Sequence, residues 1–258
     1  MEALMDVIQR IQILRRENPR ASSESTCERI YVCPLCRDLE YVEVTGEDGI
    51  PYMRECECRA KKHSLKRLEE SGLKESIEKY TFDNYNAYAP WVENVKDQAM
   101  KYVEDHDGKW LFLGGQVGAG KTHLCTAVVG ELIRQGMDAR YLMWRDDVVK
   151  IKALVTKDEE YRAVIEPLKT VKVLYIDDLF KTDKGRNPTS GDINIAFELL
   201  NYRYVNSNLI TIISSERNID QIIDVDEAVG SRIYERTRGN CVCIDSKPGR
   251  NYRLMRQA

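Results

Sequence analysis

The chain has 258 residues, of which 43% are hydrophobic and 31% charged, and its formal net charge is −3. This length suits one α/β core and a smaller unit, because domains commonly run to about 100–200 residues. The near-neutral balance excludes nucleic-acid binding driven by overall charge, and no apolar run reaches the roughly 18 residues of a membrane-spanning helix.

The first predicted element is an amphipathic helix over residues 1–18, where apolar residues recur at helical spacing. Its early acidic residues and the lack of a small-residue cleavage site are unlike a secretory signal. We therefore expect a cytoplasmic protein whose eight cysteines stay reduced.

Five cysteines follow between residues 27 and 58, and four of them form two pairs, Cys33/Cys36 and Cys56/Cys58, separated by 19 residues. Paired thiols at this separation are typical of a zinc site, and the stretch between them reads as a short hairpin. Four thiolates would satisfy the tetrahedral preference of Zn²⁺. The single residue between Cys56 and Cys58 leaves open that Cys27 or His63 replaces one ligand.

From residue 91 onward, helical patterns alternate with short apolar strands, which predicts a parallel sheet covered on both faces. The charged run 59–70 reads as a helix, and the aromatic segment 80–90 as extended or turned chain. We expect three parts: an N-terminal domain over 1–75 with a zinc unit at 27–63, a linker over 76–90, and an α/β domain over 91–258. The expected core helices are 91–105, 121–135, 145–155, 158–168, 193–206, 219–223 and 226–237, and the expected strands are 110–114, 139–144, 171–176, 209–214 and 240–244.

A phosphate-binding loop is predicted between strand 110–114 and helix 121–135, where the sequence reads Gly-x-x-x-x-Gly-Lys-Thr. Glycines let backbone N–H groups fold around phosphates, the lysine supplies a charge to the β- and γ-phosphates, and the threonine hydroxyl can ligate Mg²⁺. The start of the helix also favours an anion. The nucleotide-binding residues expected here are Gly115, Gln116, Val117, Gly118, Ala119, Gly120, Lys121, Thr122 and His123.

The second half of the predicted site follows the apolar strand 171–176. Asp177 is the natural partner of Mg²⁺, and Asp178 is placed to orient or deprotonate the attacking water. Glu216 follows the next strand, where a strand end meets the ligand crevice of such sheets. Helix 226–237 carries Arg232 and Arg236, and Arg238 follows directly after it; one of the three could reach a neighbouring subunit's γ-phosphate.

Two local basic stretches are candidates for contact with single-stranded DNA: the run from Arg54 to Arg67 beside the cysteines, and the loop 181–191. A solvated helix face explains the first equally well.

Residues 80–245 resemble the AAA+ ATPases of bacterial replication, most closely the DnaC/DnaI helicase loaders and their phage-encoded members, which are related to IstB-like and DnaA ATPases. The matching motifs are Tyr80–Tyr85, Gly115–His123, Ile176–Asp178, Ser214–Arg217 and Gly230–Arg232. The resemblance implies a five-stranded parallel sheet in the order 5-1-4-3-2 and activity as a homo-oligomer. It also implies that Phe82 and Tyr85 lie near the adenine, that Glu216 is a sensor, and that Arg232 is an arginine finger.

Two departures from the loader pattern bear on function. Asp177-Asp178 is the DnaA version of a motif that is Asp-Glu in the loaders, which puts the hydrolysis rate in question. The chain ends about a dozen residues after the last predicted strand, which favours a loader over an initiator with a duplex-DNA domain.

Our leading hypothesis is an ATP-dependent loader of a replicative helicase, using ATP, Mg²⁺ and Zn²⁺ and acting along single-stranded DNA. An IstB-type transposition helper shares the same core. A small-molecule P-loop kinase and a module that uses ATP only as a structural switch are the alternatives from other classes.

Overall fold

The computed structural model describes residues 31–46, 49–70, 73–183 and 186–255. The helix predicted over residues 1–18 and Cys27 lie outside these ranges. Among the described residues, no helix is long and apolar enough to cross a membrane.

The described elements follow the predicted order closely. The strands are β1 (Tyr41–Thr45), β2 (Pro51–Glu55), β3 (Leu111–Gly115), β4 (Ala139–Met143), β5 (Val173–Asp177), β6 (Ile210–Ser214) and β7 (Cys241–Ile244). The helices are α2 (Glu57–Glu70), α3 (Lys74–Lys79), α4 (Pro90–Glu104), α5 (Lys121–Arg134), α6 (Trp144–Leu154), α7 (Asp158–Thr170), α8 (Ser190–Val205), α9 (Ile219–Val225), α10 (Glu227–Arg236) and α11 (Tyr252–Met255). Of these, α3 and α11 were not predicted, and β1 and β2 form the expected antiparallel hairpin.

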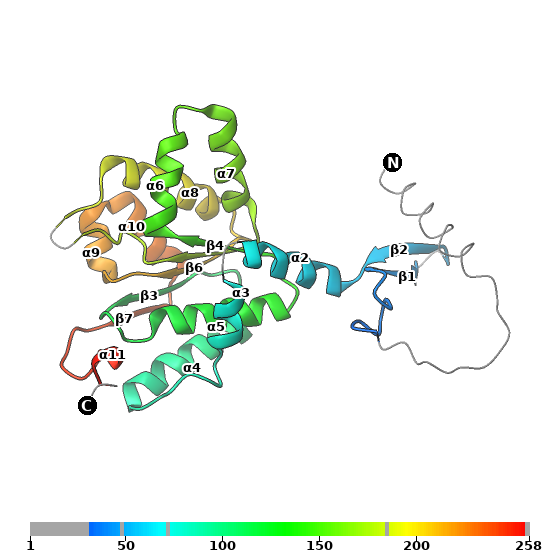
Figure 1. Ribbon diagram of the computed structural model, residues 1–258, viewed down its shortest axis with the longest axis horizontal. Coiled ribbons are helices and arrows are strands. Elements are labelled where there is room, and N and C mark those ends of the chain that lie inside the picture. Colours follow the sequence, from blue (N-terminus) through cyan, green and yellow to red (C-terminus); the bar gives the residue numbers. More distant parts are fainter. Residues whose placement is uncertain (1–30, 47–48, 71–72, 184–185, 256–258) are drawn as a thin grey trace. The chain divides into compact units, whose positions relative to one another are not determined.

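A five-stranded parallel sheet in the order β4-β5-β6-β3-β7 forms the core. Numbered along the core and read from β7, this is the predicted order 5-1-4-3-2. Helices α4 and α5 cover one face, while α6 to α10 cover the other (Figure 1). The predicted α/β fold class, with a five-stranded parallel sheet covered on both faces, is therefore confirmed.

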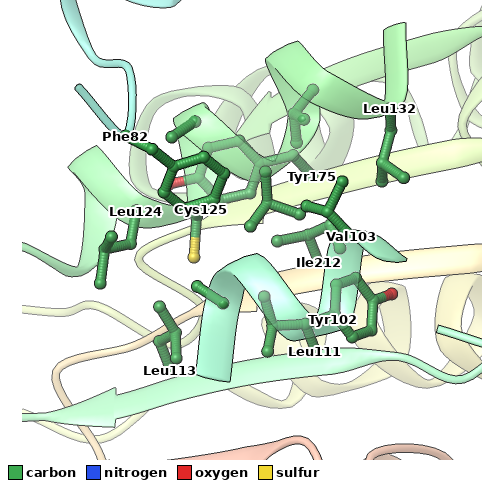
Figure 2. Packing of buried hydrophobic residues seen from close by; sticks show 14 of the residues in the cluster. Phe82, Tyr102, Val103, Leu111, Leu113, Leu124, Cys125, Leu132, Tyr175 and Ile212 are labelled. Carbon is green, nitrogen blue, oxygen red and sulfur yellow. The ribbon is translucent and has the colours of Figure 1, made fainter. Parts of the chain in front are cut away.

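The two faces of the sheet are built by residues that alternate along each strand. On β3, Leu111 and Leu113 join the cluster beneath α4 and α5, whereas Phe112 joins the opposite cluster. Figure 2 shows Leu124, Cys125 and other side chains of α5 packed against β3 and its neighbours. Because successive side chains of a strand point to opposite faces, continuous apolar strands are what a sheet buried on both sides requires.

Helix α8 begins three residues earlier than predicted because of its cap. The Thr189 hydroxyl accepts a hydrogen bond from the backbone N–H of Asp192, and the Asp192 carboxylate accepts one from the Thr189 N–H. This reciprocal pair satisfies backbone donors that the first turn leaves open. The loop after β5 therefore ends at Thr189.

Arg203 of α8 is a fully buried cation, with 0% of its surface exposed. Its guanidinium donates to the carbonyls of Leu168, Lys169 and Val171, at the end of α7. Further donors reach the Ile210 carbonyl and the Thr211 hydroxyl. The last turn of a helix leaves carbonyls without internal partners, so one side chain of α8 caps α7 and ties both helices to β6. Burial lowers the pKa of this guanidinium to about 9.

Candidate nucleotide and metal sites

The predicted phosphate-binding loop joins the end of β3 to the start of α5, as expected. Gly115 has φ +95°, and a Cβ there would lie 2.2 Å from the carbonyl oxygen of Ile244. That same carbonyl accepts the N–H of Gln116 at 2.9 Å, and the Gly115 N–H donates to the Arg217 carbonyl at 3.2 Å. Only glycine permits this close approach, so the strand ends on either side of β3 fix the path of the loop.

Lys121 begins α5 and is the buried cation of the loop, only 6% exposed. Its Nζ donates to the carbonyls of Gly115 and Gln116, at 2.8 and 2.7 Å. Burial lowers the pKa of the ammonium, against the opposing charges of Asp178 and Glu216. A buried ammonium held by neutral carbonyls gains from an arriving anion, which is the charge that a phosphate group would supply.

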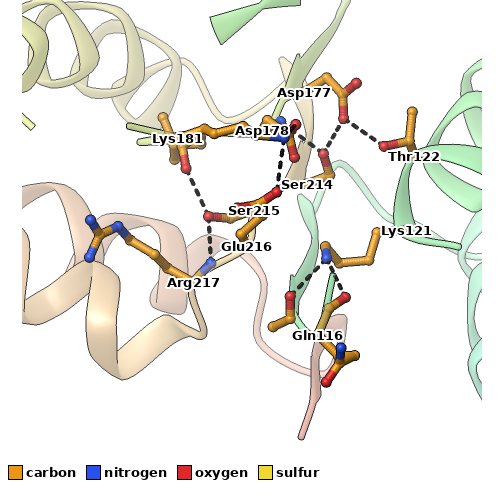
Figure 3. A network of polar contacts seen from close by, with 12 residues as sticks. Gln116, Lys121, Thr122, Asp177, Asp178, Lys181, Ser214, Ser215, Glu216 and Arg217 are labelled. Carbon is orange, nitrogen blue, oxygen red and sulfur yellow. Dashed lines mark hydrogen bonds and ion pairs between the residues drawn. The ribbon is translucent and has the colours of Figure 1, made fainter. Parts of the chain in front are cut away.

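Asp177 lies at the end of β5 inside a set of hydroxyl donors. Thr122 donates to its Oδ1 at 3.1 Å, Tyr175 donates to the same oxygen at 2.8 Å, and Tyr141 donates to Oδ2 at 3.0 Å. The Ser214 hydroxyl also donates to Oδ1 (Figure 3). These neutral donors fix the carboxylate beside the Thr122 hydroxyl. A hydroxyl and a carboxylate are the hard oxygen ligands that Mg²⁺ takes alongside phosphates, so this pair fits a magnesium ion.

Asp178 and Glu216 come from neighbouring strand ends and share one lysine. Lys181 Nζ lies 2.6 Å from Asp178 Oδ2 and 2.9 Å from Glu216 Oε1. Burial by itself lowers the pKa of Lys181, but its hydrogen bonds to the two carboxylates raise it overall. The two predicted acidic residues are thus held together, and Lys181 is a site residue that the motif did not identify.

The segment before α4 packs against the loop and α5. Tyr85 donates to the Ala119 carbonyl at 3.4 Å, and its ring lies 2.8 Å from where a Cβ of Gly120 would be. His123 Nε2 contacts the Thr81 carbonyl at 2.8 Å, and the His123 ring lies edge-on to Tyr85. Burial lowers the pKa of His123.

The other predicted residues of this region differ in exposure. Phe82 is buried among the core residues next to α5 (Figure 2). Ala119 is buried, whereas Val117 is 41% exposed at the top of the loop. The binding roles of these three residues stay predictions.

The C-terminal segment also reaches the phosphate-binding loop. The N–H of Tyr252 donates to the Gly118 carbonyl at 3.0 Å. The Tyr252 ring stacks on Tyr88, with centroids 5.4 Å apart, and its hydroxyl accepts a hydrogen bond from Asn86. The chain segments before and after the α/β core therefore meet at the apex of the loop.

The three arginines of the α10 region have different surroundings. Arg232 donates to Asn201 and to the Ala228 carbonyl, and it packs on the rings of Phe197 and Tyr204. Arg236 donates to backbone carbonyls of two loops, including that of Gly108, while Arg238 is exposed. Which arginine acts across an interface stays a prediction, and the family resemblance favours Arg232.

The four predicted zinc ligands cluster. The sulphur atoms of Cys33, Cys36, Cys56 and Cys58 all lie within 4.8 Å of one another. Zn–S bonds of about 2.3 Å place tetrahedral sulphurs about 3.8 Å apart, so this set fits one zinc ion after small movements. His63 is exposed and is not part of the cluster.

Sequence reasoning missed the tyrosine donors to Asp177. Tyr175 precedes Asp177 by two residues and so shares its face of β5, and Tyr141 is the cross-strand partner of Tyr175. The alternation along β5 predicts the first contact, whereas the second needs the pairing register of β4.

The sequence is similar to one described protein family and to two proteins of Bacillus subtilis. A family model described as IstB-like ATP binding protein matches residues 52–258. The uncharacterised protein YqaM of Bacillus subtilis (strain 168) is 34% identical over 205 residues, covering 75% of this chain but only 64% of YqaM. XkdC, a protein of the phage-like element PBSX from the same strain, is 30% identical over 233 residues, covering 86% of this chain and 85% of XkdC.

A solved structure shares the fold of the chain. The crystal structure of the DnaC helicase loader matches with a TM-score of 0.54 at 17% identity, covering 66% of this chain and 98% of that one.

Proposed function

The chain belongs to the IstB-like ATP-binding protein family, and we propose that it is an ATPase that loads a replicative DNA helicase in a phage or prophage. Its relative XkdC belongs to a phage-like element, and its fold is that of a protein described as a helicase loader.

The observation that carries the proposed ATPase is the meeting of three chemically distinct groups at one edge of the sheet. Lys121 is a buried cation without a carboxylate partner among the described residues, and Thr122 contacts Asp177 at 3.1 Å. Asp178 and Glu216 lie on the side of β5 and β6 (Figure 3). Phosphoryl transfer to water requires a cation that binds phosphate, ligands for a metal ion and a base that activates the water, and these three groups can supply them.

In the proposed reaction, the loop N–H groups and Lys121 hold the β- and γ-phosphates of ATP. Thr122 and Asp177 are the residues that would hold Mg²⁺, which would neutralise phosphate charge when bound. Asp178 orients and deprotonates the attacking water, while Glu216 senses the γ-phosphate. Arg232 of a neighbouring copy would stabilise the developing charge, so hydrolysis belongs to a homo-oligomer.

The N-terminal region is the part of the chain that we propose selects the partner protein. We propose that the zinc ion folds the cysteine unit, because such small hairpins lack a core of their own, and that this unit contacts the helicase. Single-stranded DNA would bind the basic stretches, and the expected cytoplasmic location suits both partners.

The test is complex formation by the full-length protein with its cognate replicative helicase, followed by size-exclusion chromatography with light scattering. We expect a complex with ATP that is lost in Lys121→Ala, because the buried ammonium no longer holds the phosphates. Lys150→Ala is the matched control: this exposed helix lysine pairs with Asp147, away from the loop. Absence of a complex at every ATP concentration would contradict the proposal that the protein loads a helicase.

The second candidate is an IstB-type helper ATPase of transposition, because the matching family is described as IstB-like. It uses the same nucleotide chemistry but a different partner. Retention of a transposase, and not a helicase, by the immobilised full-length protein would decide for it.

A further inference from the structure

Lys181 joins the two carboxylates on which hydrolysis would depend. Its ammonium lies 2.6 Å from Asp178 and 2.9 Å from Glu216, and all three side chains are about one-quarter to one-third exposed, at 28%, 25% and 33%. Figure 3 shows this group beside the phosphate-binding loop, at the ends of β5 and β6. Charge-assisted contacts of this length are the strong class of hydrogen bond.

The backbone holds Lys181 in this position. Asp178 and Phe180 have φ +58° and +59°, a left-handed conformation that costs energy for residues with a side chain. The Lys181 N–H donates to the Asp178 carbonyl, and the Leu179 N–H donates to Ser214, at 2.9 Å each. The turn that brings Lys181 to Asp178 is therefore hydrogen-bonded to β6. Such strained turns persist only where surrounding contacts impose them.

The ion pair occupies one oxygen of the proposed base. Asp178 Oδ2 accepts a hydrogen bond from the Lys181 ammonium, so the lone pair directed at Lys181 is not available to take a proton from the attacking water. Lys121, the cation needed for phosphate, is engaged separately with loop carbonyls. Lys181 therefore neutralises the two hydrolytic carboxylates and not the phosphate site.

We infer that Lys181 is a positioning residue that restrains hydrolysis: it holds Asp178 and Glu216 in a resting pair that must open before Asp178 can act on water. The inference rests on the proposed ATPase activity. A pocket of about 180 Å³ borders Lys181 and gives the ammonium room when the pair opens. It is also lined by Asp183, a third carboxylate, which pairs with Arg145 at 2.9 Å.

The test compares steady-state ATP hydrolysis by the full-length wild type, Lys181→Met and Lys181→Arg, without helicase or DNA. We expect Lys181→Met to raise kcat about tenfold, equivalent to about 1.4 kcal/mol of barrier, with KM changed less than twofold. Lys181→Arg keeps the charge and should return kcat to the wild-type level. The double variant Lys181→Met, Asp178→Asn should lose the gain, because the released base is then missing.

Lys152→Met is the matched control. Lys152 pairs with Asp192 at the same 2.6 Å, and the lysine itself is similarly exposed at 32%, but the pair joins α6 to α8. The kcat of this variant should therefore stay at the wild-type level. Thermal unfolding of each variant checks that it folds.

The outcomes separate this inference from the proposed function. An unchanged or lower kcat in folded Lys181→Met overturns the restraint, even where wild-type hydrolysis upholds the ATPase. Hydrolysis in Lys181→Met with none in the wild type supports the restraint strongly. ATP binding without hydrolysis in either protein overturns both ideas, whereas failure to bind a helicase affects neither kinetic comparison.

Discussion

The buried guanidinium of Arg203 gives the sharpest stability prediction. Replacing it in Arg203→Met keeps an unbranched chain of similar length but removes every donor. The carbonyls of Leu168, Val171 and Ile210 are buried, and their distances to the guanidinium are 3.1, 2.9 and 2.5 Å. In the variant these acceptors lose their partner and water cannot replace it.

The expected loss follows from two opposing effects. A buried acceptor left unpaired costs about 1–3 kcal/mol, so three of them cost about 3–9 kcal/mol. Removing the charge offsets part of this loss of stability, because the folded variant no longer buries an ion, which costs several kcal/mol. We expect a net loss of about 3 kcal/mol, a large part of the roughly 5–15 kcal/mol by which domains are stable.

Urea unfolding followed by circular dichroism measures this loss, and about 3 kcal/mol corresponds to a fall in Tm of about 6–12 °C for a domain of this size. Arg162→Met, at an exposed position of α7, is the control and should change stability by less than about 0.5 kcal/mol. A loss below about 1 kcal/mol in Arg203→Met would refute the reasoning, because α7 would then not depend on its cap.

Two further predictions concern the binding sites. Gly115→Ala should weaken ATP binding at least about tenfold in a fluorescent-nucleotide titration, because the new Cβ meets the Ile244 carbonyl at 2.2 Å and displaces the loop. Gly136→Ala is its control, since that glycine also has positive φ but open space around it; equal affinities in the two variants would contradict the prediction. Purified protein should carry one zinc per chain by elemental analysis, and Cys56→Ser should lose most of it, whereas Cys243→Ser, at an exposed residue outside the cluster, should keep it. Zinc-free wild type with a folded hairpin would count against the metal site.

The order and type of the core elements were predictable because each strand is a short apolar run and each helix has a period near 3.6. The predicted helix boundaries were wrong where a capping pair sets the end of a helix. The start of α8 is encoded in Thr189 and Asp192, a capping pair three residues apart. Helix α3 has only six residues, too few for a periodic pattern to stand out.

Some residues of the candidate nucleotide site were likewise predictable from the sequence, and others were not. Lys121 and Asp177 follow from motif spacing, because their positions are fixed by the strands that end beside them. Tyr141 and Lys181 could not be predicted, since their contacts depend on the register of β4 and on a left-handed turn after β5. Such features arise from tertiary packing and have no counterpart in local sequence.

The contact between Tyr252 and Gly118 has a practical consequence. A fluorophore attached to the short helix that begins at Tyr252 would lie beside the phosphate-binding loop. A dye at that position is therefore well placed to report nucleotide binding through its emission. An affinity tag inserted there would disturb the same event, so purification handles belong elsewhere in the chain.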